Sequence, residues 1–411
     1  MKSFIPEKPT DVTWTDDQWK AIWAKDQDIL VAAAAGSGKT AVLVERIIQK
    51  ILSADDPIDV DELLVVTFTD ASAAEMRNRV GEALEKAISA NPKSKHLRKQ
   101  LSLLNRASIS TLHSFCLQVV KKYYYKIDID PSFRIADTTE SLLLRDEVLD
   151  ELLEEEYGKD NNEPFYALVD TFTKDRTDDA LKDMIGEIYD FATSNPSFQN
   201  YLNKIVSMYE IEDGATIDDL PFTKILLNDI EIQLNGAKQL FESALNLTKL
   251  PAGPSPRAET FLEDIQITDV LLQAKKDGWN TLYEAMQSYS FPRLKPVRGD
   301  EYDKELAEKS KDLRDKGKKI IDKIKGELFS RRPESFLKDM NEMAPHIHVL
   351  ADLVKKFADN FERAKLEKGI VDFSDLEHYC LRILGKEDEE GNFHPTEVAH
   401  YYRNKFKEVL V

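Results

Sequence analysis

Lys39 and Thr40 end a glycine-containing stretch whose residue types suit the binding of a phosphate chain. Residues 28–40 read D-I-L-V-A-A-A-A-G-S-G-K-T. The glycines let backbone N–H groups converge on phosphate oxygens, the lysine can reach the β- and γ-phosphates, and the threonine hydroxyl suits Mg²⁺. The pattern G-x-x-x-x-G-K-[ST] is met except at its first position, which is Ala33. A phosphate-binding loop is therefore predicted, with an ordinary strand-to-helix turn as the alternative.

Strand and helix patterns alternate around this loop. The apolar run at 28–34 predicts a buried strand, and the helical pattern that follows runs to about residue 52. A second strand and helix are predicted at 62–68 and 69–90, and further strands at 107–110 and 133–136. Repeated strand–helix units without a hairpin signal indicate parallel strands in an α/β sheet.

The pattern changes at about residue 138. Long amphipathic helices are predicted at 141–157, 178–193, 221–248, 304–329 and 334–367, and strand signals almost vanish. The sequence then predicts a helix start at 372–376, a charged loop at 385–392 and a last strand at 406–411. We therefore expect a helical domain of more than 200 residues between two parts of an α/β domain.

Charge and cysteine content limit the classes of function. The net charge of −19 argues at first against nucleic acid, but residues 1–135 hold 19 Lys and Arg against 18 Asp and Glu. The remainder holds 37 against 57, so the acidity belongs to the later part. Two cysteines are too few for a disulfide framework, and no apolar run is long enough to span a membrane. We expect a cytoplasmic protein.

Four stretches together resemble the N-terminal motifs of the UvrD/Rep-like superfamily one DNA helicases. They are W-T-D-D-Q-W at 14–19, A-A-A-G-S-G-K-T at 33–40, V-V-T-F-T-D-A-S-A-A-E-M at 65–76 and S-T-L-H-S-F at 110–115. The D-F-S-D-L stretch at 372–376 is similar to the family's D-F-x-D-L. The resemblance extends over essentially the whole chain, and the spaced set is far more specific than the phosphate loop alone.

The resemblance implies an α/β fold with a RecA-like P-loop NTPase domain, whose parallel sheet is incomplete here, and a large inserted all-helical accessory domain. Residues 1–137 would form the first part of the RecA-like domain, 138–368 the accessory domain, and 369–411 the return. The family implies an ATP-driven 3′–5′ helicase. Members that carry a nuclease domain act with a partner subunit on DNA ends in double-strand break repair and homologous recombination.

The resemblance also assigns residues. ATP and Mg²⁺ are the implied cofactors, with Lys39 and Thr40 catalytic and Thr40 a Mg²⁺ ligand. Residues that would contact the nucleotide are Gln18, which would read the adenine edge, and Ala33, Ala34, Ala35, Gly36, Ser37, Gly38, Lys39 and Thr40. Single-stranded DNA would contact Thr67, Phe68, Thr69, Thr111, His113 and Ser114. Phe68 as a core residue and Gln18 as a plain surface residue are the alternatives.

Two departures from the family pattern matter. Asp70 stands where the family usually has Asn, and an anion there would repel a phosphate. In the family, the strand predicted here at 406–411 runs straight into D-E-x-Q-D, whose carboxylates hold the Mg²⁺ shell and activate water. Neither carboxylate is present in this sequence. We therefore expect an N-terminal fragment that binds nucleotide weakly and hydrolyses it negligibly. A non-catalytic ATP- or DNA-binding module and an unrelated P-loop ATPase or kinase are the alternative functions.

Overall fold

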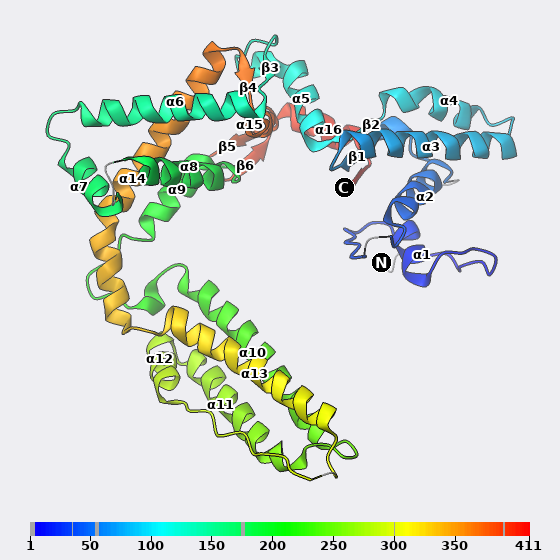
Figure 1. Cartoon of the computed structure of the whole chain (residues 1–411). Coiled ribbons are helices and arrows are strands. Elements are labelled where there is room, and N and C mark those ends of the chain that lie inside the picture. Colours follow the sequence, from blue (N-terminus) through cyan, green and yellow to red (C-terminus); the bar gives the residue numbers. More distant parts are fainter. Residues whose placement is uncertain (1–4, 35, 54–56, 174–176, 300, 389–390) are drawn as a thin grey trace. The chain divides into compact units, whose positions relative to one another are not determined.

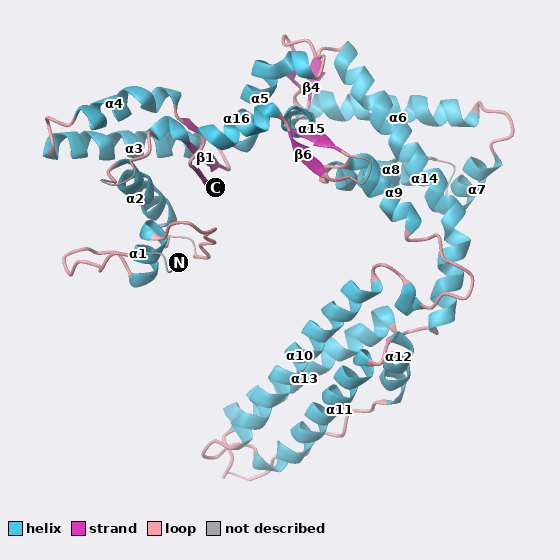
Figure 2. Cartoon of the chain, turned by 180° about the vertical axis from the view of Figure 1, so that it is seen from behind, coloured by secondary structure: helices cyan, strands magenta, loops and turns pink. Residues whose placement is uncertain are grey.

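The computed structural model describes residues 5–34, 36–53, 57–173, 177–299, 301–388 and 391–411. Its elements fall into two compact units. One comprises residues 1–150, 193–197 and 359–411, and the other comprises 151–192 and 198–358. Helices make up most of both units (Figure 2). No described helix is long and apolar enough to cross a membrane.

The first unit is built on a short parallel sheet. Strand β1 (Leu63–Thr67) lies between β2 (Ser108–Thr111) and β7 (Glu408–Leu410), and both pairings are parallel. The strands predicted at 62–68, 107–110 and 406–411 are thus present with bounds shifted by one or two residues. This part of the fold is a mixed α/β structure, mostly helical, with a small parallel sheet.

Three helices share an apolar core with this sheet. These are α2 (Lys39–Ile51), α3 (Asp70–Ala90) and α4 (Lys95–Leu103). The buried residues of α3 recur every three or four positions, as a helix with one apolar face requires. They are Ala73, Met76, Val80 and Leu84, and they share one core with Ile47 and Ile51 of α2 and with Leu63 and Val65 of β1.

A second core in the same unit joins segments that are far apart in sequence. Helix α5 (Leu112–Tyr123) packs against α15 (Phe373–Leu384) and α16 (Glu397–Lys405) around Cys116, Val120, Leu376 and Cys380. Beside them β3 (Arg134–Ile135) pairs in parallel with β4 (Ile370–Val371). The strand expected at 133–136 therefore exists, in a separate two-stranded sheet, and α6 (Thr138–Tyr157) follows it.

The second unit contains helices and no strands among its described residues (Figure 1). Its elements are α7 (Glu163–Phe172), α8 (Asp179–Thr193), α9 (Phe198–Ser207), α10 (Thr223–Thr248), α11 (Ala258–Lys276), α12 (Trp279–Ser288), α13 (Lys304–Leu328) and the first part of α14 (Pro333–Glu367). Helices α10 and α13 approach closely at Gly317, where an added Cβ would lie only 2.5 Å from the ring of Phe241. The buried pair Arg314–Asp264, with Nε to Oδ2 at 2.6 Å, ties α13 to α11.

Two predictions about local structure are wrong. Residues 28–34 do not form a strand, and Leu30 is 96% exposed. A strand needs hydrogen-bonding neighbours, and among the described residues no strand pairs with 28–34. The charged loop at 385–392 begins instead as β5 (Gly385–Glu387), which pairs antiparallel with β6 (Phe393–Pro395).

Candidate functional site

The phosphate loop leaves the start of α2 open. Gly36 and Gly38 have φ of +77° and +82°, a backbone region that glycine adopts at little cost. Gly38 is the N-cap of α2, and it offers no side chain to the first N–H groups of the helix. These N–H groups and the positive end of the helix dipole therefore face outward, as an anion site requires.

The reactive side chains of the loop lie at the surface. Lys39 Nζ donates to the carbonyl oxygens of Ala33 at 2.8 Å and Ala34 at 3.1 Å, and Thr40 is exposed beside it. The partners of this ammonium among the described residues are neutral carbonyls, so it can turn to a triphosphate at small cost. The predicted contact Ala35 lies outside the described residues.

Gln18 lies directly against this loop. It belongs to α1 (Asp16–Trp23), which Thr15 caps, and its Oε1 accepts from Thr15 N at 2.8 Å. Its Nε2 donates to Ser37 O at 3.0 Å. A Cβ on Gly38 would stand 3.4 Å from that Nε2, so the amide lies within van der Waals range of the glycine. The structure thus places the predicted adenine-reading residue beside the predicted phosphate loop.

A second group of predicted residues meets where β1 and β2 end. We call Thr67, Phe68, Thr69, Thr111, His113 and Ser114 the strand-end surface. The parallel register sets Thr67 opposite Thr111, which brings the two sequence stretches together. Thr69 caps α3 and Thr111 caps α5 through their side-chain oxygens. Phe68 is 100% exposed, which excludes the alternative that it is a core residue.

Two residues that the sequence did not assign complete this surface. His113 Nε2 lies 3.0 Å from Glu377 Oε1, and its ring lies 4.7 Å, centroid to centroid, from that of Phe373. Phe373 is 53% exposed. The D-F-S-D-L stretch signalled a helix start, but no local pattern could pair it with a helix some 260 residues earlier in the chain.

Asp70 is held by the strand-end surface itself. Its Oδ1 accepts from Thr111 Oγ1 at 3.3 Å and from Ser114 Oγ at 3.4 Å. The carboxylate therefore joins the start of α3 to the start of α5. Two of the hydroxyls predicted to meet DNA already have an anionic partner within the chain.

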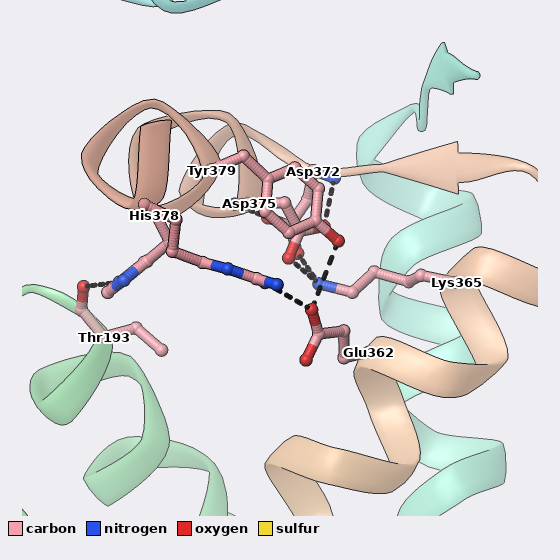
Figure 3. A network of polar contacts seen from close by, with 8 residues as sticks. Thr193, Glu362, Lys365, Asp372, Asp375, His378 and Tyr379 are labelled. Atoms are coloured by element: carbon pink, nitrogen blue, oxygen red, sulfur yellow. Dashed lines mark hydrogen bonds and ion pairs between the residues drawn. The ribbon is translucent and has the colours of Figure 1, made fainter. Parts of the chain in front are cut away.

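A buried ion cluster fixes the start of α15. Lys365 Nζ, whose side chain is 2% exposed, lies 2.7 Å from Asp372 Oδ2 and 2.6 Å from Asp375 Oδ1 (Figure 3). The same carboxylates cap α15, since Asp375 N donates to Asp372 and Asp372 N to Asp375, each at 2.8 Å. Burial raises the pKa of Asp375 to about 6, although the ammonium of Lys365 acts to lower it. The cluster sets the position of Phe373 and Glu377.

The basic stretch at 93–99 has a structural part in this unit. Its helix α4 begins after Ser94, which caps it, and His96 Nε2 bonds to Ile51 O at 2.9 Å. Lys99 pairs with Asp59, and both the hydrogen bond and the charge of Lys99 lower the pKa of that carboxyl. These contacts place 93–99 at the start of a helix that packs within the first unit.

The sequence matches the UvrD/REP helicase N-terminal domain over residues 14–411. The chain belongs to this helicase family. The family match extends over both units and includes Gln18, the phosphate loop and the strand-end surface. The resemblance inferred from four short motifs is therefore confirmed at the level of the family.

Curated relatives named as ATP-dependent helicase/nuclease subunits share 52% identity with the chain over 406 residues. They include those of Bacillus thuringiensis subsp. konkukian, Bacillus cereus strain AH187 and Bacillus cytotoxicus. Each alignment takes in 99% of this chain and 33% of the relative. The chain thus spans about a third of the length of these relatives.

Proposed function

We propose that this chain forms the N-terminal part of an AddA-type ATP-dependent DNA helicase/nuclease. Such a protein acts on DNA ends in double-strand break repair and homologous recombination. The family match and the name of the relatives support this function. The observation that carries it is the fully exposed ring of Phe68, on the same unit as the open start of α2.

ATP with Mg²⁺ is the proposed nucleotide. The glycine conformations and the open start of α2 fit a triphosphate, whose oxygens would take the N–H groups of residues 36–40. Lys39 would turn from its carbonyl partners to the β- and γ-phosphates, and the Thr40 hydroxyl would hold Mg²⁺. The metal would screen the phosphate charge. Gln18 would present its amide to the adenine edge.

Single-stranded DNA is the proposed ligand of the strand-end surface. The exposed ring of Phe68 would stack on a base, and the ring of Phe373 would extend the apolar surface near His113. The hydroxyls of Thr111 and Ser114 and the N-terminal ends of α3 and α5 would face backbone phosphates.

The whole motor would use both ligands in turn. ATP would close two RecA-like domains on the strand and hydrolysis would reopen them, so that repetition moves the protein 3′ to 5′. Residues 1–137 and 369–411 would belong to the first such domain. Residues 138–368 would form an inserted accessory domain that meets duplex DNA or an AddB-type partner in a heterodimer.

Two titrations of the purified chain test the proposal. MgATP binding is measured by calorimetry, and binding of a fluorescein-labelled oligo(dT) by anisotropy. We expect Lys39→Ala to weaken MgATP at least tenfold and leave oligo(dT) within twofold. Phe68→Ala should weaken oligo(dT) about fivefold or more and leave MgATP within twofold, since one stacked base contributes about 1–3 kcal/mol. Loss of both ligands in either variant, or binding of neither by the wild type, would overturn the assignment.

A further inference from the structure

Arg46 is a buried cation that joins three elements of the first unit. It lies on α2, two turns after Lys39, and is 8% exposed. Its Nε donates to Glu408 Oε1 on β7 at 2.6 Å. Its Nη1 donates to the carbonyl oxygens of Ala21 at 2.7 Å and Ile22 at 3.3 Å, in the last turn of α1.

Glu408 has a second cation. Lys50, one turn further along α2, places Nζ 2.8 Å from Glu408 Oε2, and the Glu408 side chain is 15% exposed. Glu408 itself is fixed in the sheet, because β7 pairs it with Leu63 of β1. The sheet therefore anchors α2 through two cations, but only Arg46 also reaches α1.

The elements that Arg46 joins carry the groups proposed to meet the nucleotide. Ala21 lies three residues after Gln18 on α1, and Arg46 lies seven residues after Lys39 on α2. A guanidinium suits this place because its planar fork can bind a carboxylate through one edge and carbonyls through another. One ammonium at the same position could not reach both partners.

We propose that Arg46 is the positioning residue for base recognition, holding the helix of Gln18 against the helix of Lys39. The proposal rests on the nucleotide site described above. The guanidinium fixes the position and rotation of α1 relative to α2, so that the Gln18 amide stays beside Ser37 and Gly38. The phosphate loop keeps its form through its own glycines. Loss of Arg46 should therefore weaken recognition of the base more than recognition of the phosphates.

The experiment compares MgATP with magnesium tripolyphosphate, which has the phosphates without the base. Affinities of the 411-residue chain for both are measured by calorimetry. We expect Arg46→Met to weaken MgATP about tenfold and to leave tripolyphosphate within twofold. Lys50→Met is the matched control, since it removes a cation from Glu408 without touching α1, and it should leave the ratio of the two affinities unchanged within twofold.

A double-mutant cycle links the effect to Gln18. In a Gln18→Ala background Arg46→Met should cause no further loss of MgATP affinity beyond twofold. If Arg46→Met does not fold, Arg46→Lys replaces it, because it keeps the charge beside Glu408 and loses the carbonyl contacts. It should lower the ratio of the two affinities in the same direction.

Several results would overturn the proposal. Equal losses for both ligands would mean that Arg46 only supports the fold, and an unchanged ratio would mean that α1 needs no anchor. Additive losses in the double mutant would separate Arg46 from Gln18. A wild type that binds tripolyphosphate as tightly as MgATP would contradict recognition of the base but would leave the phosphate site in place. A wild type that binds neither would overturn the nucleotide site as well.

Discussion

The phosphate loop and the strand-end surface both use the start of a helix, but they leave it in opposite states. Helix α2 begins after Gly38, which has no side chain to satisfy its N–H groups. Helices α3 and α5 begin after Thr69 and Thr111, whose oxygens accept from Ser72 N at 3.0 Å and Ser114 N at 3.3 Å. The first start leaves its N–H groups open to water or an external anion, and the other two are already capped.

Because of this difference, the phosphate loop offers backbone groups to a ligand, whereas the strand-end surface offers side chains. At the phosphate loop the backbone N–H groups would do the proposed binding, and glycine suits the positive φ. At the strand-end surface the side chains cap, stack and pair, so a ligand must compete with internal partners. Helix α15 is an extreme of the second kind, since Asp372 and Asp375 cap it and Lys365 neutralises them.

Removal of Lys365 should have the largest effect on the capped starts. Lys365→Met leaves two carboxylates at a buried helix start without their cation, which costs about 3 kcal/mol of local stability. Hydrogen exchange of α15 amides should accelerate about a hundredfold. Lys338→Met, which removes an exposed cation from the same helix α14, is the control. An unchanged exchange rate in Lys365→Met would mean that the cap alone holds α15.

The pKa of Asp375 gives a test with a definite sign. Its folded pKa of about 6 lies above the unfolded value of about 3.8. Between pH 4 and 6 the folded state therefore binds more protons, so the stability of α15 falls as pH rises. Asp375→Asn removes this effect. The difference in opening free energy between wild type and variant should fall by about 2 kcal/mol from pH 4 to 6.5, after exchange rates are corrected for pH. A difference in opening free energy that stays constant from pH 4 to 6.5 would contradict the raised pKa of Asp375.

The cap of α5 should matter less. Thr111→Val keeps the shape of the side chain but loses the oxygen that accepts from Ser114 N, which costs about 1 kcal/mol. Oligo(dT) should bind severalfold more weakly, because α5 starts less firmly. Thr171→Val is the control, since that exposed hydroxyl donates to Ala167 O within α7 and caps no helix start. Equal changes in stability for the two variants would remove the distinction between capped and open starts.

The sequence predicted the local elements of the site but not the contacts between distant segments. The strand at 62–68 followed from an apolar β-branched run, a short strand was also predicted at 107–110, and helices were predicted to start at Thr69 and Thr111. The run at 28–34 is also mostly apolar but is exposed, because strand formation depends on partners that composition does not report. Glu408 beside Arg46 is separated from it by 362 residues, and no local pattern reports such a pair.

Asp70 should produce the smallest effect, with a sign that separates two roles. If its carboxylate mainly repels phosphate, Asp70→Asn should tighten oligo(dT) binding about two- to threefold. The salt dependence of the oligo(dT) affinity should change little. An amide can still accept from Thr111 and Ser114, so the link between α3 and α5 survives. Glu82→Gln, about 18 Å further along α3, controls for the loss of one charge. Weaker binding in Asp70→Asn would instead mean that the charge itself orders the hydroxyls, so that both capped starts depend on an internal anion, in contrast to the uncapped start of α2.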